Sequence, residues 1–230
     1  MRYRRIVMAA LAFVLVVGAV GALTGFRRQA VAGPTTGIDP AAFTNPVANP
    51  YFPLKVGTVL HYLGSDGGQR FRERLTITHW TKKIQGVTTT VLLDVLRRAD
   101  DNAGNAWYFG EKTATYTRTG NVISRDGSWQ AGIHGAVAGT IMPANPHPTD
   151  AYRQEFLAGH AEDQAWIVQR TAHVSVPHRH LDHVVRSFEW TRLEPGVLSV
   201  KLYAPGLGIV KERDMSGGSE TFEVVAVHRP

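Results

Sequence analysis

The sequence predicts an all-β domain, an antiparallel and strongly curved sheet or half-barrel of about nine or ten strands, after an N-terminal hydrophobic helix. Three observations support this. Beyond residue 50, apolar residues recur at every second position, which is the spacing of a strand with one buried face. Short clusters of Gly, Asp, Asn and Pro separate these segments. No amphipathic helix pattern follows residue 33. Because bare strand edges invite aggregation, we expect a closed or nearly closed sheet with a long irregular flap.

Residues 1–32 predict a signal anchor or a signal peptide. The basic residues of Met1–Arg5 precede an apolar run from Ile6 to Phe26, which is long enough to span a bilayer as a helix. Ala30-Val31-Ala32 fits a cleavage site, whereas Arg27-Arg28 directly after the run favours an uncleaved anchor. Both alternatives stay open. In either case the positive-inside rule predicts an extracytoplasmic domain, anchored to the membrane through this helix or secreted.

Residues 33–50 predict an extended linker, because prolines and small residues disfavour a helix. The domain is then expected over residues 51–230. Its predicted strands, in order, are Thr58–Leu63, Arg70–Trp80, Val87–Arg97, Asn105–Tyr116, Tyr152–Leu157, Gln164–Val176, Val184–Leu193, Val197–Tyr203, Gly208–Arg213 and Thr221–His228. In the second of these, Phe71, Leu75 and Ile77 alternate with polar residues, so we expect one apolar face and one solvated face.

The segment from Gly127 to Pro148 interrupts this pattern. It is rich in Gly, Ala and Pro, yet it carries Trp129, Ile133, Ile141 and Met142, which is too apolar for a disordered loop. We therefore predict an ordered flap that lies across the core without strand pairing. Trp129 is its expected buried anchor, with the other three apolar side chains adding to it.

Composition excludes several classes of protein. Five of the 25 Lys and Arg residues lie in the first 32 residues, whereas all 19 Asp and Glu residues lie beyond them. The predicted domain is therefore almost neutral, which argues against nucleic acid as a partner. The absence of cysteine excludes disulfides and thiolate metal sites. No phosphate loop, dinucleotide fingerprint or G-x-S-x-G elbow occurs, so no cofactor is predicted.

A set of aromatic residues is the first candidate for a binding site: Trp107, Tyr108, Phe109, Tyr116, Trp129, Tyr152, Phe156 and Trp166. In a curved sheet such residues either fill the core or line a concavity for an apolar ligand.

Two groups of polar residues offer alternative chemistry. His178, His180 and His183, with Asp182, could hold a metal ion, but a plain polar turn after Pro177 is the reading we favour. Glu155, Glu162 and Asp163 could perform acid–base chemistry or hold Ca²⁺, or they could simply cap turns.

Several motifs extend from residue 49 to residue 213. They are Asn49-Pro50-Tyr51-Phe52-Pro53-Leu54, Trp107-Tyr108-Phe109-Gly110-Glu111, Gly127-Ser128-Trp129 with Ala131-Gly132, Met142-Pro143-Ala144, Tyr152-Arg153-Gln154-Glu155, Leu193-Glu194-Pro195-Gly196 and Tyr203-Ala204-Pro205-Gly206 with Gly208. In these motifs the chain resembles an uncharacterised bacterial family of secreted or lipid-anchored all-β proteins. The resemblance implies location and fold rather than an activity. The chain departs from the family in lacking a lipid-bearing cysteine and in its histidine-rich turn.

The sequence leaves two functions open. The first is a non-enzymatic envelope protein that binds an apolar or amphipathic small molecule, or an envelope partner, at the aromatic concavity. The alternative is a metal-dependent or carboxylate-based hydrolase that uses the histidine turn or the Glu155 group. Convergence of polar side chains would favour the hydrolase, and an apolar cavity without such convergence would favour binding.

Overall fold

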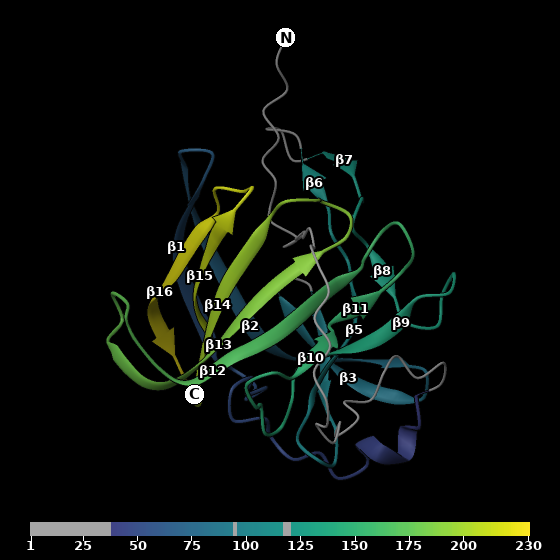
Figure 1. The fold of residues 1–230 in the computed structure, drawn as a ribbon. Coiled ribbons are helices and arrows are strands. Elements are labelled where there is room, and N and C mark those ends of the chain that lie inside the picture. The colour runs from purple at the N-terminus through teal and green to yellow at the C-terminus, as the bar shows by residue number, and fades with distance from the viewer. Residues whose placement is uncertain (1–37, 94–95, 117–120) are drawn as a thin grey trace, which may run out of the picture.

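The computed structural model of the protein describes residues 38–93, 96–116 and 121–230. These residues form antiparallel strands and one short 3-10 helix, which confirms the prediction of an all-β fold (Figure 1). No helix among them is long and apolar enough to cross a membrane. The predicted hydrophobic helix falls within residues 1–37, outside the described part of the chain.

The short 3-10 helix η1 (Pro40–Phe43) precedes the strands. In chain order these are β1 (Val59–Asp66), β2 (Gln69–Ile84), β3 (Val87–Leu93), β4 (Leu96–Asp100), β5 (Ala106–Glu111), β6 (Thr115–Tyr116), β7 (Val122–Ser124), β8 (Trp129–Gln130), β9 (Val137–Met142), β10 (Ala151–Arg153), β11 (Glu155–Phe156), β12 (Asp163–Ser175), β13 (His180–Thr191), β14 (Leu198–Ala204), β15 (Gly208–Ser216) and β16 (Thr221–His228). Most belong to one 14-stranded sheet, and β6 and β7 form a separate hairpin.

One extended segment joins the two ends of the large sheet. The strand order is β10-β12-β13-β14-β15-β16-β1-β2-β3-β4-β5-β9-β11, with β8 paired to β5. β10 and β11 are separated only by Gln154, so the same stretch of chain pairs with β12 on one side and with β9 on the other. The sheet therefore curls round until its ends meet (Figure 1). This agrees with the expectation of a closed or nearly closed sheet.

Close packing at this junction depends on Gly139 in β9. A Cβ atom added there would lie 2.4 Å from the backbone carbon of Gln154 and 2.5 Å from its carbonyl oxygen. Only a residue without a side chain fits between the two backbones.

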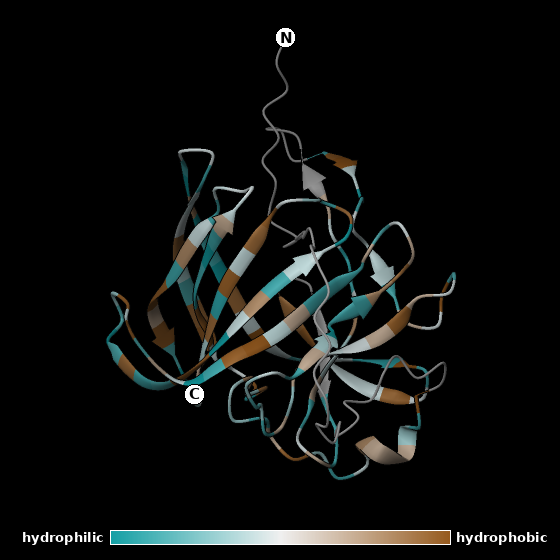
Figure 2. Cartoon of the chain, viewed as in Figure 1, coloured by the Kyte–Doolittle hydropathy of each residue, from teal (hydrophilic) through white to brown (hydrophobic). Residues whose placement is uncertain are grey.

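Most of the inside of the curled sheet is one hydrophobic core. Along the long strands, hydrophobic and hydrophilic residues alternate, as Figure 2 shows for β13 and β14. Large side chains with almost no exposure fill this interior, among them Leu60, Leu92, Phe109, Ile167, Val184, Val185 and Tyr203. The alternation that predicted one buried face per strand is thus the cause of the core.

Several predicted boundaries differ from the structure. The predicted strand Val87–Arg97 is two antiparallel strands, β3 and β4, with Val91 opposite Arg97. The predicted turn from Pro177 to His183 is shorter than expected, because β13 already begins at His180. The predicted strand Tyr152–Leu157 is split at Gln154 into β10, which pairs with β12, and β11, which pairs with β9.

Residues 38–50 pack onto the domain where an extended linker was predicted. The Asp39 side chain accepts a hydrogen bond from the Ala41 backbone amide and caps η1. Pro40 occupies the first turn of η1, a position that proline favours. The ring of Phe43 lies 5.6 Å from that of Phe109. Asn49 is fully buried, and its side-chain amide donates to the carbonyl oxygens of Gly104 and Met142.

The predicted unpaired flap is wrong, because the segment belongs to the sheet. Trp129 in β8 pairs with Glu111, and Thr140 in β9 pairs with Trp107. The sequence of β9, VAGTIM, is buried on both faces, so it lacks the alternation that marks a half-exposed strand. Trp129, Ile141 and Met142 are buried as expected, whereas Ile133 is 48% exposed and anchors nothing.

Trp129 should nevertheless hold this segment in place. Its indole is 5% exposed and packs edge-to-face on Tyr108, with ring centroids 5.1 Å apart. We expect Trp129→Ala to lower the free energy of unfolding by about 3–5 kcal/mol, because it leaves a large cavity. Limited proteolysis should then cut first between Gly127 and Pro148, since local opening exposes that backbone. Exposed Ile133→Ala serves as the control. An unchanged urea midpoint with no new cleavage would show that Trp129 is not an anchor.

Candidate functional site

A cluster of charged side chains lies inside the sheet, at strands β13, β14 and β15. The alternation of these strands turns Glu189, Lys201 and Glu212 inward, where an apolar side chain would be expected. Lys201 lies directly opposite Glu212 in the sheet register, and Glu189 lies opposite Ser199. Glu189 and Glu212 are 1% and 0% exposed. Charges buried this deeply persist only when they are paired.

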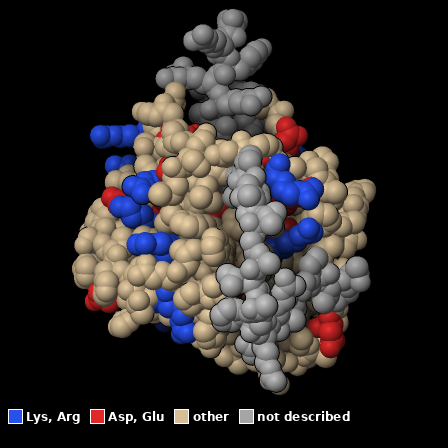
Figure 3. All heavy atoms as spheres, viewed as in Figure 1, with Lys and Arg blue, Asp and Glu red and all other residues tan. Residues whose placement is uncertain are grey.

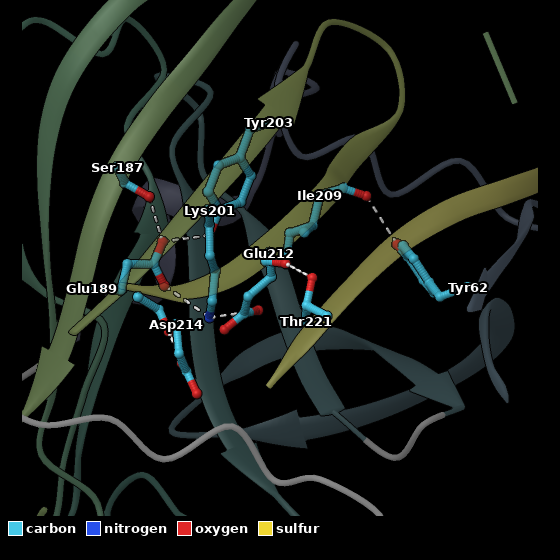
Figure 4. A network of polar contacts seen from close by, with 10 residues as sticks. Tyr62, Ser187, Glu189, Lys201, Tyr203, Ile209, Glu212, Asp214 and Thr221 are labelled. Carbon is cyan, nitrogen blue, oxygen red and sulfur yellow. Dashed lines mark hydrogen bonds and ion pairs between the residues drawn. The ribbon is translucent and has the colours of Figure 1, made fainter. Parts of the chain in front are cut away.

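Lys201 is the cation that pairs both carboxylates (Figure 4). Its Nζ lies 2.8 Å from Glu189 Oε2 and 3.8 Å from Glu212 Oε2. The hydroxyls of Ser187 and Tyr203 each donate a 2.7 Å hydrogen bond to the other oxygen of Glu189. The Glu189 carboxylate is therefore bound by three side chains, one from its own strand β13 and two from the neighbouring strand β14. Glu212 has only the distant ammonium among the contacts of the described residues, and neither of its oxygens accepts a hydrogen bond there.

Burial and pairing act against each other in this cluster. Burial alone would lower the pKa of the Lys201 ammonium, but the carboxylates of Glu189 and Glu212 outweigh it and raise the pKa. Burial raises the pKa of Glu212 well above its ordinary value, and the nearby Lys201 only partly opposes this. Glu220, in the turn directly before β16, has its pKa raised to about 7 by burial, although the nearby Lys201 ammonium acts to lower it.

A second pair of carboxylates adjoins the cluster. Glu155 of β11 is buried and Asp163 of β12 is partly buried, and the closure of the sheet brings them together. Burial raises the pKa of Glu155 well above its ordinary value, and the Asp163 carboxylate raises it further. Burial likewise raises the pKa of Asp163, while Lys201 opposes the shift. Two neighbouring carboxyls that resist ionisation are a pattern found at catalytic sites and at structural networks alike.

Glu162, which the sequence grouped with these two, faces elsewhere. Its Oε1 accepts a 2.9 Å hydrogen bond from the Gly159 backbone, and its Oε2 lies 3.1 Å from Arg192 Nε. Both carboxylate oxygens of Glu162 are thus engaged outside the Glu155–Asp163 pair. The members that the sequence analysis missed are Glu189, Lys201 and Glu212. In the sequence they could have been recognised as charged residues at positions where the alternation of three neighbouring strands predicts an inward side chain.

The predicted aromatic residues do not gather around one open concavity. Phe109, Trp129 and Tyr152 are buried core residues. Trp107 is partly buried and donates a 2.8 Å hydrogen bond to Asp101, and Phe156 lies 4.5 Å under the Arg153 guanidinium. Trp166 is 42% exposed and packs on Phe188. Tyr116 lies in β6, but its side chain is outside the described part of the structure.

Only one of the three predicted metal-binding histidines joins a cluster of potential ligands. His180 lies beside Asp182 and beside His173, a residue that the sequence analysis did not consider. His178 is not in this group. Its backbone amide donates a 3.3 Å hydrogen bond to the carbonyl oxygen of Val224. His183 is exposed, has a left-handed backbone with φ of 54° and is not in the group either.

A hollow of about 820 Å³ lies over a different part of the sheet, across β15, β16, β1 and β2. Its lining residues are Leu63, Gly64, Ser65, Arg70, Phe71, Arg72, Lys211, Thr221, Phe222 and Glu223. Register places Leu63 between Arg72 and Glu223, and Lys211 opposite Glu223. Figure 3 shows basic side chains gathered on the side of the molecule where Figure 1 places these strands. We call this surface the basic hollow.

The basic hollow combines apolar surface with excess positive charge. Exposed Leu63 and partly buried Phe71 supply the accessible apolar part, and the ring of Phe222 beneath them is buried. A Cβ atom at Gly64 would lie 2.3 Å from Phe71 Cζ and 2.5 Å from the Thr221 carbonyl oxygen, so the aromatic ring and the neighbouring backbone leave room only for glycine. Lys211 pairs with Glu223 at 2.8 Å, while Arg70 and Arg72 are exposed. In the sequence, this site is indicated only by arginine at every second residue of β2, at positions 70, 72 and 74.

No protein-family model matches the chain, and no curated protein matches it. The resemblance noted from sequence motifs therefore stays a prediction. Two solved structures are similar in fold over most of their length. One is a "putative exported protein with YmcC-like fold" from Bacteroides fragilis, with 14% identity and a TM-score of 0.38 over 77% of this chain and 98% of that one. The other is a "putative lipoprotein" from Parabacteroides distasonis, with 9% identity and a TM-score of 0.38 over 79% and 100%. No residue role is transferred from either.

The interior carboxyls predict how stability changes with pH. The pKa of Glu220 rises from 4.5 to about 7 on folding, so the folded protein holds the proton of this carboxyl more tightly than the unfolded chain does. Its contribution to the free energy of unfolding is therefore fully present at pH below about 4.5 and is lost as the pH rises through about 7. We expect Glu220→Gln to remove this loss. The change in the free energy of unfolding between pH 5 and pH 8 should shrink by roughly 1–3 kcal/mol relative to the wild type.

Urea unfolding at several pH values checks this prediction. Asp126→Asn, which removes an exposed carboxylate in a turn, is the matched control and should leave the profile unchanged. A Glu220→Gln profile parallel to that of the wild type would mean that the Glu220 carboxyl is not buried enough to matter.

Proposed function

We propose that the protein is a non-enzymatic, extracytoplasmic binding module, and that its ligand is an anionic amphiphile held in the basic hollow. The observation that carries the proposal is the composition of this hollow, with an apolar surface made by Leu63 and Phe71 and three basic residues beside it. This keeps the amphipathic ligand expected from the sequence, but moves it from the aromatic residues to the opposite part of the sheet.

Size and charge both fit such a ligand. Small-molecule sites commonly have volumes of about 300–1,000 Å³ and apolar linings with few polar groups, and the basic hollow, at about 820 Å³, is in that range. Arg70 and Arg72 are exposed. Arginine binds carboxylates and phosphates through two parallel hydrogen bonds. An acyl chain on the apolar surface with its acidic head at the arginines uses both features.

The proposed location follows from the N-terminal sequence. The basic residues before the apolar run and the run itself predict export or anchoring, with the domain outside the cytoplasm. Such a domain would meet free fatty acids, detergents and lipids at the membrane surface. The proposed ligand class and the proposed location therefore support each other.

Carboxylate-based hydrolysis is the second candidate. It is favoured by the adjacent Glu155 and Asp163 carboxyls, whose raised pKa values are typical of general acids. Access of a substrate to these two carboxyls argues against hydrolysis. Neither carboxyl lines the basic hollow, nor the small apolar crevice between Phe52, Leu60 and Leu207. A hydrolase would need the closed sheet to open beside β11.

Binding of dodecanoate tests the main proposal. We expect the Arg70→Gln/Arg72→Gln variant to bind dodecanoate and dodecyl phosphate roughly tenfold more weakly, the equivalent of about 1.4 kcal/mol, because an ionic contact to the head group is lost. Dodecanol has no charge, so its weaker binding should not change. Displacement of a fluorescent fatty acid from the purified full chain measures all three.

Two controls locate the ligand. Arg179→Gln removes an exposed arginine at the β12–β13 turn and should bind as the wild type does. Glu155→Gln should also leave binding unchanged if the ligand lies in the basic hollow. If Glu155→Gln weakens binding and the arginine variant does not, the ligand lies in the interior and the proposal fails.

A reporter fused after Pro230 tests the location. An enzyme that is active only outside the cytoplasm, such as a periplasmic phosphatase, should be active in this fusion. Deleting residues 1–32 should abolish that activity, because the export signal is lost. Activity from a reporter that works only in the cytoplasm would contradict the proposed orientation.

A further inference from the structure

The hairpin of β12 and β13 places four polar side chains on one face. Ser175 lies directly opposite His180, and Val174 lies opposite Leu181. His173 and Asp182 lie one position further from the turn, where the strand register shifts, and their side chains are in contact. Because alternate residues share a face of a strand, His173, Ser175, His180 and Asp182 all project to the same side. Val174 and Leu181 project to the other side, where Leu181 is buried.

Three of these side chains converge on one point. Asp182 Oδ1 lies 2.6 Å from His173 Nδ1 and 3.2 Å from His180 Nε2. The two imidazole rings are stacked almost in parallel, at 5° and 6.5 Å between centroids. One potential ligand atom from each residue lies within 4.8 Å of the other two. All three side chains are more than half exposed, so the point of convergence is open to solvent.

We propose that His173, His180 and Asp182 bind a divalent transition-metal ion, of which Zn²⁺ is the first to test. Two imidazoles and one carboxylate form a donor set that suits Zn²⁺ and its neighbours Cu²⁺ and Ni²⁺. Tetrahedral bonds of about 2.0–2.2 Å place neighbouring ligand atoms roughly 3.3 Å apart. The His180–Asp182 distance already matches this value, and the His173–Asp182 distance has to open by less than 1 Å.

Ser175 positions one of the ligands. Its hydroxyl lies 2.9 Å from His180 Nδ1, on the far side of the ring from Asp182. When Nδ1 donates its hydrogen to this hydroxyl, the lone pair of Nε2 is directed to the metal position. A metal-bound histidine is commonly oriented in this way by a hydrogen bond from its other nitrogen. Ser175 is therefore a positioning residue, and solvent completes the coordination.

Titration of the purified full chain with Zn²⁺, followed by calorimetry and by the visible absorption of Co²⁺ as a substitute, tests the site. We expect one strong site per chain. The double variant His173→Ala/His180→Ala should weaken Zn²⁺ affinity at least 100-fold, and Asp182→Asn at least tenfold. Ser175→Ala should weaken it roughly tenfold, because an orienting hydrogen bond is lost. Thermal melting of each variant without metal establishes that it is folded.

His160→Ala and His178→Ala are the matched controls. His160 lies in an exposed turn between β11 and β12, and His178 lies in the same hairpin turn as the proposed site but outside the cluster. Both should bind Zn²⁺ like the wild type. Equal affinity in the His173→Ala/His180→Ala variant would overturn the proposal, as would a loss of affinity in His178→Ala that exceeds the loss in His173→Ala.

Discussion

The ion cluster of Lys201 with Glu189 and Glu212 is the constraint on which the interior of this sheet depends. It joins three neighbouring strands, β13, β14 and β15, from inside the core. Removing a carboxylate from water costs several kcal/mol, and only a paired cation and hydrogen bonds offset this cost. Glu189 has both, through Lys201, Ser187 and Tyr203. Glu212 has the more distant contact, which agrees with its raised pKa.

Closure of the sheet extends this polar interior to the chain segment between β9 and β12. Gly139 lets the backbone at Gln154 approach β9, and the same segment then brings Glu155 to Asp163 beside Lys201. The proposed binding surfaces lie elsewhere, at the basic hollow over β1 and β2 and at the tip of the β12–β13 hairpin. The interior cluster thus acts on the scaffold, and the exposed strand faces supply the sites.

The fold could be predicted from alternation, and the failures have a common cause. Strands with one wet face, such as the one around Phe71 and Ile77, follow a period of two that is visible in the sequence. β9 is buried on both faces, so its sequence lacks the alternation of a strand and predicts a flap instead. Of the candidate sites, Glu155 and Asp163 were identified, but Lys201 was not, because charged residues in strands are normally assigned to the wet face. His173 lies beside His180 only because the β12–β13 hairpin turns before His180, whereas the sequence predicts a turn that extends to His183.

The most direct test of this account is the free energy of unfolding of Lys201→Met compared with the triple variant Lys201→Met/Glu189→Gln/Glu212→Gln at neutral pH. If Lys201 neutralises the interior, the single variant should lose about 3–5 kcal/mol, because it leaves two buried carboxylates uncompensated. The triple variant should regain most of this loss, because neither Glu189 nor Glu212 is then left as a buried carboxylate without its cation. A single variant within about 1 kcal/mol of the wild type, or a triple variant as unstable as the single one, would contradict the central role of the cluster.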